Sequence, residues 1–190
     1  VSGRRGHDQV DGAVGVDVGR ENRARFWASG EALLCLERTV AVPEENIRVV
    51  GESVVGLQCF PSPGHASHHV SMLHEDGTLY AGDSCGVRIA PGRFVLPPTP
   101  PPDIDLEAWE RTIAETERRG PARLALTHFG VFDDVEDHLA RLRETLHRWG
   151  ERVGHGMDEA TFVAAARADC LAADPDEIAA YDRPAPYYQC

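Results

Sequence analysis

Residues 62–83 read SPGHASHHVSMLHEDGTLYAGD, and this stretch decides the fold. A Pro-Gly pair precedes His65, a run of alternating character follows, and Asp-Gly at 76–77 is typical of a tight hairpin turn. The second run ends at Gly82 and Asp83. The pattern therefore predicts strands over 69–73 and 78–81, with a histidine before the first strand and a carboxylate after the second.

The sequence on either side of this hairpin predicts more strands, followed by helices. Runs rich in β-branched and apolar residues predict strands over 47–50, 54–60 and 123–127. Helices are predicted from Asp105 to Gly120, from a capping box formed by Asp133 and Glu136, and from Asp158 onward. The last of these helices is expected to bury Phe162, Val163, Ala166 and Leu171. This order predicts an α/β protein, of the layered α+β kind, with mixed strand directions.

Composition and charge narrow the possible partners and the compartment. The chain of 190 residues carries a net charge of −12, which disfavours binding to nucleic acid. No apolar run approaches the ~18 residues that span a bilayer, and no apolar core follows the basic residues near the start. The five cysteines form no C-x-x-C pair, so we expect reduced thiols. We therefore expect a cytoplasmic protein with no nucleic-acid or membrane partner.

Three polar residues follow strand-like or turn segments that are far apart in the sequence: His65, Asp83 and His128. Strand ends can meet at one edge of a sheet, where open α/β folds place their sites. Two imidazoles and one carboxylate are suitable ligands for Zn²⁺ or another first-row metal. The residues therefore predict a metal site. His68 and His69 are interpreted either as support for His65 or as polar neighbours with no role in the site.

The segments PGHASHHVSM, GTLYAGD and LALTHFG resemble the metallo-β-lactamase superfamily of metallo-hydrolases, in its glyoxalase-II-like branch. The resemblance covers 47–149. It implies an αββα sandwich and metal ligation by His65, Asp83 and His128. It also implies that Asp83 bridges two metals and orients the attacking hydroxide.

The chain departs from this family near its start. The family motif H-x-H-x-D-H is not intact, because the nearest stretch is RGHDQVDG at 5–12. One alignment places His7 at the middle histidine of the motif, which would make it a further metal ligand, and a shift by one residue would place Asp11 at its last histidine. At least two ligands are missing in either case. The sandwich is therefore expected to be incomplete at its N-terminal side and to be covered by a second copy in a homodimer.

These inferences predict a single domain over 1–190, with a degenerate or truncated part at 1–45, a best-matching core at 46–155, and C-terminal helices and a tail at 156–190. The resemblance implies a zinc-dependent hydrolase that uses one or two ions, with iron or manganese as alternatives. A metal-bound hydroxide would attack an ester, thioester or lactam-like carbonyl of a small molecule. The proline-rich segment at 97–102 is expected to cross the surface and to form one wall of the pocket. Two alternatives remain: an inactive relative that serves in binding or oligomerisation, and a mononuclear-iron oxygenase.

Overall fold

The computed structural model describes residues 43, 45, 51–99, 104–176 and 178–181. The chain divides into two compact units, 1–51 and 52–190, and the elements below all belong to the second. His7, the RGHDQVDG stretch and the strand predicted over 47–50 lie outside the described residues. The single domain and the homodimer therefore stay predictions.

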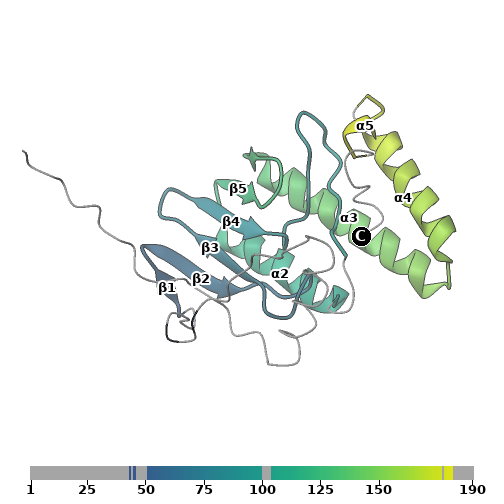
Figure 1. Cartoon of the computed structure of the whole chain (residues 1–190). Helices are drawn as coiled ribbons and strands as arrows, with labels where there is room; N and C mark the ends of the chain where they lie inside the picture. Colours follow the sequence, from purple (N-terminus) through teal and green to yellow (C-terminus); the bar gives the residue numbers. More distant parts are fainter. Residues whose placement is uncertain (1–42, 44, 46–50, 100–103, 177, 182–190) are drawn as a thin grey trace, which may run out of the picture. The chain divides into compact units, whose positions relative to one another are not determined.

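The described strands form one mixed sheet whose order follows the sequence (Figure 1). Neighbouring strands are antiparallel except β4 and β5, which run parallel and are joined through α2 (Leu106–Arg119). The strands are β1 (Ser53–Val54), β2 (Leu57–Pro61), β3 (Val70–Leu73), β4 (Thr78–Gly82), β5 (Arg123–Leu126) and β6 (Val131–Phe132). The sheet and its helices confirm the predicted layered α+β class.

Two short strands differ from the sequence expectation. The run predicted as one strand over 54–60 is broken by a turn, because Val55 and Gly56 both have positive φ, as the central residues of a type I′ turn require. β6 was not predicted. It follows β5 after a reversal at Phe129 and Gly130, which also have positive φ. Both turns join antiparallel neighbours by only a few residues.

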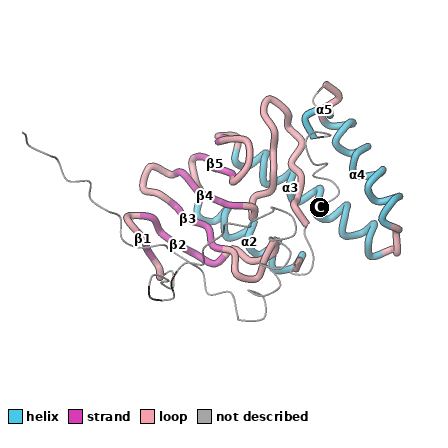
Figure 2. Tube along the Cα trace, viewed as in Figure 1, coloured by secondary structure: helices cyan, strands magenta, loops and turns pink. Residues whose placement is uncertain are grey.

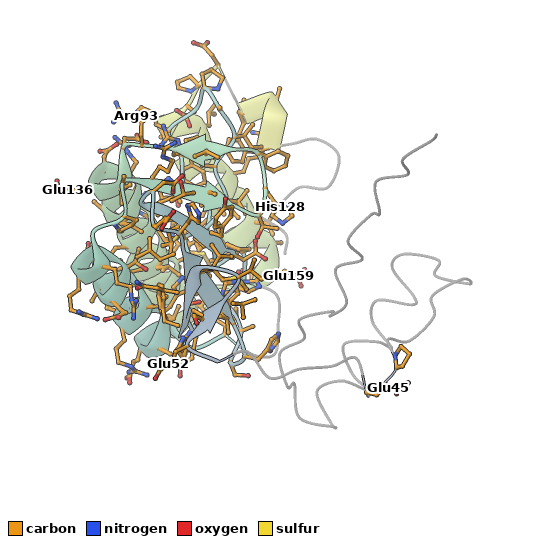
Figure 3. All side chains as sticks on the ribbon, turned by 90° about the vertical axis from the view of Figure 1, so that its left-hand side faces the viewer. Glu45, Glu52, Arg93, His128, Glu136 and Glu159 are labelled. Carbon is orange, nitrogen blue, oxygen red and sulfur yellow. The ribbon has the colours of Figure 1, made fainter. Side chains whose placement is uncertain are left out.

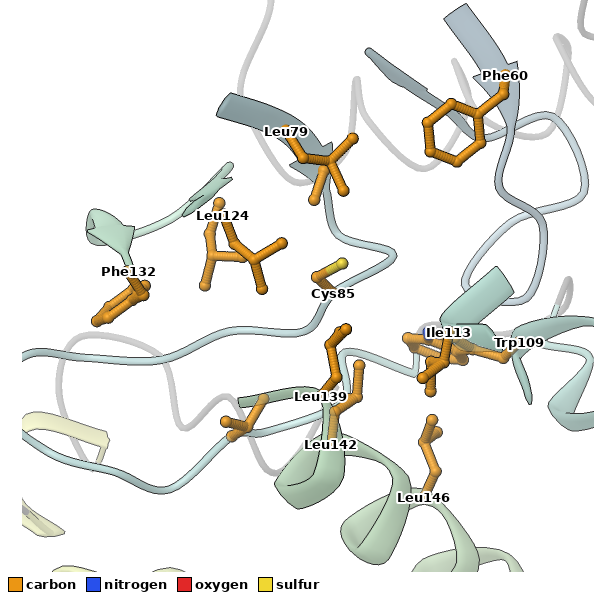
Figure 4. Close-up of a cluster of buried hydrophobic side chains, with 13 residues drawn as sticks. Phe60, Leu79, Cys85, Trp109, Ile113, Leu124, Phe132, Leu139, Leu142 and Leu146 are labelled. Atoms are coloured by element: carbon orange, nitrogen blue, oxygen red, sulfur yellow. The ribbon is translucent and has the colours of Figure 1, made fainter. Parts of the chain in front are cut away.

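Helices α2 and α3 (Val135–Gly154) lie on one face of the sheet (Figure 2). β4 alternates accordingly: Leu79 and Ala81 are fully buried, whereas Tyr80 is 50% exposed. The main core contains side chains from the sheet and from both helices, including Leu79, Leu124, Ile113, Leu139 and Leu142 (Figure 4). Packing of this face fixes the positions of the ends of β4 and β5.

The helix starts are as predicted in two of three cases. Asp105 caps α2 and Asp158 caps α4 (Glu159–Ala173), each through its side chain. The predicted capping box before α3 is wrong, because the N-cap is Asp134 and its side chain makes no capping bond. Its carboxylate instead accepts two hydrogen bonds from Arg88, at 2.8 and 2.9 Å.

A second buried cluster joins the segment after β4 to the C-terminal helices. Val87 pairs with Leu96 in an isolated bridge, so this segment is buried before it reaches the proline run. The cluster contains Phe94, Leu96, Trp149, Ala166, Cys170 and Tyr181, the last from α5 (Ile178–Tyr181). Leu171 was predicted to be buried but is 41% exposed, because Cys170 occupies the inward position on α4. Within the described ranges, no helix is long and apolar enough to cross a membrane.

Candidate metal centre

His65 lies in the turn segment between β2 and β3, and its ring is fixed from two sides. Its Nδ1 lies 2.9 Å from the carbonyl oxygen of Pro98, which can only accept a hydrogen bond, so Nδ1 carries the proton. The ring also meets Trp109 edge-on, at 5.9 Å between centroids. Gly64, with φ of 136°, allows this approach because a Cβ there would overlap with Trp109. The unprotonated Nε2 therefore faces Asp83.

Asp83 directly follows β4, next to an irregularity in the register between Tyr80 and Gly82. Its Oδ2 lies 3.6 Å from Nε2 of His65, and its Oδ1 lies 3.6 Å from Nε2 of His128. Oδ1 is buried and accepts no hydrogen bond from the part of the chain that is described. A buried carboxylate oxygen normally has a partner, so this atom has unused capacity for a ligand.

His128 follows β5 after Thr127, and the parallel pairing of β4 with β5 places it beside Asp83. Its side chain is 41% exposed and lies at the edge of the part of the chain that the structure describes (Figure 3). The side chain of Asp83 is 24% exposed and that of His65 is 14% exposed. The three side chains thus form a group that solvent reaches from the side of His128.

The donor set suits a borderline metal such as zinc, which binds imidazole nitrogen and carboxylate oxygen. Each imidazole faces a different oxygen of Asp83, and neither distance is short enough for a hydrogen bond. The convergence is pairwise, since no three His, Cys, Asp or Glu side chains among the described residues already form a metal-holding group. The carboxylate of Asp83 lies between two imidazole nitrogens, and its Oδ1 has no hydrogen-bond partner among the described residues, which fits a cation.

His69 fixes the backbone of Asp83. Its Nε2 accepts a hydrogen bond from the backbone N–H of Asp83 at 3.1 Å, so Nδ1 must carry the proton and donate to Oγ of Ser62 at 2.8 Å. Burial, together with the nearby His65, lowers the pKa of His69 to about 4. Gly82 has φ of 58°, and a Cβ at this position would overlap with the ring of His69. The ring is therefore a neutral support for the turn that carries Asp83.

Three buried serines, Ser62, Ser71 and Ser84, form a hydrogen-bond network that holds His69. Ser71 donates to Oγ of Ser62 at 2.8 Å and lies 3.1 Å from Oγ of Ser84. Ser84 donates to the carbonyl of Ala81 at 2.7 Å. All three serines are fully buried. A buried polar network with its partners in place holds one arrangement rigidly, so it fixes the side of His69 that faces away from Asp83.

The structure thus brings His65, Asp83 and His128 together, and their predicted role as metal ligands stays a prediction. His69 takes the supporting role that the sequence left open, although it supports Asp83 rather than His65. His68 has a buried Nδ1 with no hydrogen-bond partner in the described ranges. Sequence reasoning missed the carbonyl of Pro98 and the serines, because neither a backbone oxygen nor an isolated serine leaves a signal in the spacing. Cys85, near Asp83, is a core residue: burial raises its pKa to about 12.

Comparison with known proteins gives a consistent result. No protein-family model matches the chain. Over 83 residues, 43% of the chain, it is 32% identical to a metallo-beta-lactamase fold-containing protein of Sulfurisphaera tokodaii, of which the match covers 30%. The crystal structure of an archaeal metallo-beta-lactamase superfamily protein from Sulfolobus tokodaii matches with a TM-score of 0.52 and 25% identity, over 65% of this chain and 52% of that chain.

A metallo-beta-lactamase family protein from Thermus thermophilus matches over 84% of this chain and 57% of that chain, with a TM-score of 0.46 and 20% identity. The first two matches are to the same archaeal protein, so the comparisons concern two proteins, and the chain spans less than two thirds of the length of each.

Proposed function

We propose that this chain, which has the metallo-β-lactamase fold, is a metal-dependent hydrolase. Its curated and structural neighbours point consistently to the metallo-β-lactamase superfamily. Its substrate is a small molecule with an ester, thioester or lactam-like carbonyl. The proposal depends on one observation: His65 and His128 approach the two oxygens of one carboxylate, Asp83, from separate segments of the chain.

His65, Asp83 and His128 would hold the metal through two imidazole nitrogens and a carboxylate. Zinc suits this set, and iron or manganese binds similar donors. When bound, such a metal polarises a carbonyl and lowers the pKa of a bound water to about 7.

The protein's own contribution is to orient these groups. The Pro98 carbonyl keeps the proton of His65 on Nδ1, which leaves Nε2 available as a ligand. His69 holds the backbone of Asp83. Oδ1 of Asp83, which has no partner among the described residues, would accept a hydrogen bond from an attacking water and orient it toward the carbonyl.

The test is a measurement of metal content and affinity. The full chain is loaded with zinc, dialysed and analysed for metal per chain, together with the variants His65→Ala, Asp83→Asn and His128→Ala. We expect about one equivalent, and a loss of affinity in each variant larger than the ~10–100-fold that outer partners of a ligand cost. His147→Ala is the matched control, because His147 is an exposed histidine on α3.

Hydrolysis of p-nitrophenyl acetate by the zinc-loaded protein, with the apoprotein as reference, then tests the reaction. The proposal fails if no zinc binds, or if the three variants bind zinc as tightly as the His147→Ala control. Two equivalents that persist in the control would show that the chain has a second zinc site.

A further inference from the structure

An apolar cavity of about 380 Å³ lies between the start of α2, the second half of α3 and the start of α4. Its walls include Ile104, Leu106, Trp149, Phe162 and Val163. The volume falls at the lower end of the range of small-molecule pockets, roughly 300–1,000 Å³. The core uses one wall of the cavity, since Trp149 is buried and meets Phe162 edge-on at 5.2 Å. The shape is therefore held by packing.

His65, Asp83 and His128 do not line the cavity, but two of its walls are connected to the segment that carries His65. Pro97 and Thr99 line it, and the carbonyl of Pro98 between them accepts the hydrogen bond from His65. On a second side, Ile104 and Leu106 line it, and the backbone N–H of Asp105 between them donates to the carbonyl of Gly64 at 3.0 Å. In each of these two walls, the residue between two lining residues is hydrogen-bonded to Gly64 or His65.

The lining selects the chemistry of an occupant. Among the described residues that line it, the side chains are apolar or absent, as at Gly150, apart from Thr99 and the exposed carboxylate of Glu159. None of these described residues is cationic, and a phosphate or a free carboxylate would be repelled by Glu159. Apolar cavities do not hold water well, so an uncharged apolar group gains by entering.

We propose that this cavity receives the apolar acyl chain of the substrate, whose carbonyl end lies at His65 and Asp83. The substrate class is then an uncharged ester or thioester of an apolar acid. This inference rests on the proposed function for its reaction, but the cavity itself needs no metal.

Binding to metal-free protein tests the cavity separately from catalysis. Isothermal titration calorimetry with 1-octanol, a neutral alkyl probe, is carried out on the full chain and on Val153→Trp. Val153 lines the cavity and is 59% exposed, so a tryptophan can fill the space without entering the core. We expect 1-octanol to bind the unaltered chain and to bind Val153→Trp at least about tenfold more weakly.

Leu171→Trp is the matched control, because Leu171 lies on α4, is 41% exposed and does not line the cavity. It is expected to bind 1-octanol as the unaltered chain does. The proposal is overturned if 1-octanol does not bind, or if Val153→Trp binds it as tightly as Leu171→Trp.

Zinc-loaded protein provides the second readout. The ratio of kcat/KM for p-nitrophenyl octanoate to that for p-nitrophenyl acetate is expected to fall at least about tenfold in Val153→Trp and to stay unchanged in Leu171→Trp. An unchanged ratio in both variants would overturn the assignment of the cavity to the acyl chain. If 1-octanol binds as expected but neither ester is hydrolysed, the proposed function fails and the apolar site is retained.

Discussion

The backbone N–H of Asp83 donates a hydrogen bond to Nε2 of His69. This contact gives the first prediction, which concerns a single residue. His69→Leu removes the acceptor and leaves the turn after β4 without its support. We expect zinc affinity to fall by about 10–100-fold, as for other outer partners of a metal ligand. His69→Gln should recover part of the loss, because its side-chain oxygen can accept the same hydrogen bond. Competition with a chromophoric chelator measures the affinity.

His74→Leu is the control for this prediction, since His74 lies in the turn between β3 and β4 and its side chain is 39% exposed. The prediction is contradicted if His69→Leu and His74→Leu bind zinc with equal affinity.

Gly82 gives a second prediction at this scale. Gly82→Ala places a Cβ in the ring of His69 and on a backbone with φ of 58°. Gly56→Ala is the matched control, because Gly56 also has positive φ but no atom lies within 4 Å of its Cβ position. Backbone strain alone should cost each variant about 1–2 kcal/mol of unfolding free energy. Gly82→Ala should lose more than this amount, and it should also bind zinc more weakly, whereas Gly56→Ala should do neither. Urea unfolding and chelator competition measure the two effects; equal effects of both variants would contradict the role given to His69.

At this scale the sequence predicts which residues meet, but not how they are held. His65, Asp83 and His128 could be found because polar residues after strand-like runs are conspicuous, and because strand ends share an edge. The tautomer of His65 depends on a backbone carbonyl of Pro98, more than thirty positions away. A backbone oxygen has no residue identity, so its role depends on the route of the chain and not on a motif.

At the scale of elements, α3 carries a buried histidine, His138, that makes the unfolding free energy of the protein depend on pH. His138 is fully buried, and its Nε2 donates to the carbonyl of Cys85 at 2.8 Å. Burial lowers its pKa below the ordinary value of 6.5, and the charge of Arg88 lowers it further. Protonation is therefore easier in the unfolded chain. The stability that depends on neutral His138 is fully present above about pH 6.5 and is lost as the pH falls from there toward the folded-state pKa.

We expect the unfolding free energy of the unaltered chain to fall between pH 7.5 and pH 5.5, and that of His138→Leu to fall less. Urea unfolding at both pH values measures this. His69 titrates with the same sign, so some slope remains in the variant. His155→Leu, an exposed position after α3, should keep the full slope; a slope in His138→Leu as steep as this control would refute the assignment.

Elements with strong local signals were predictable, and those that depend on distant partners were not. α2 begins after a capping aspartate and ends at Gly120, which has the left-handed conformation, so both of its ends could be predicted from the sequence. The capping box before α3 was wrong because the N-cap is Asp134 and not Asp133, and because the carboxylate of Asp134 binds Arg88, far away in the sequence, and does not cap the helix. β6 was missed because two residues show no period, and only pairing with β5 makes them a strand.

At the scale of the whole described unit, Tyr181 ties the last helix to the segment after β4. Its hydroxyl donates to the carbonyl of Phe94 at 2.9 Å and accepts from the N–H of Ile89 at 3.1 Å. Tyr181→Phe leaves two backbone groups without this partner. We expect a loss of about 1–3 kcal/mol of unfolding free energy, measured by urea unfolding. Tyr80→Phe, at a half-exposed position on β4, should change stability by no more than about 0.5 kcal/mol. Equal losses would contradict the role of Tyr181.

The parallel pairing of β4 with β5 has a kinetic consequence. Asp83 and His128 become neighbours only after the chain has crossed over through α2, and contacts so distant along the chain form slowly because closing the intervening loop costs entropy. A chain on its way to the native state can bring His65 beside Asp83 through the antiparallel strands β2, β3 and β4, but it lacks the third ligand, His128, until β5 has paired with β4. Zinc would therefore leave the rate of refolding nearly unchanged. It would bind the native protein, slow its unfolding and so lengthen the lifetime of the native state.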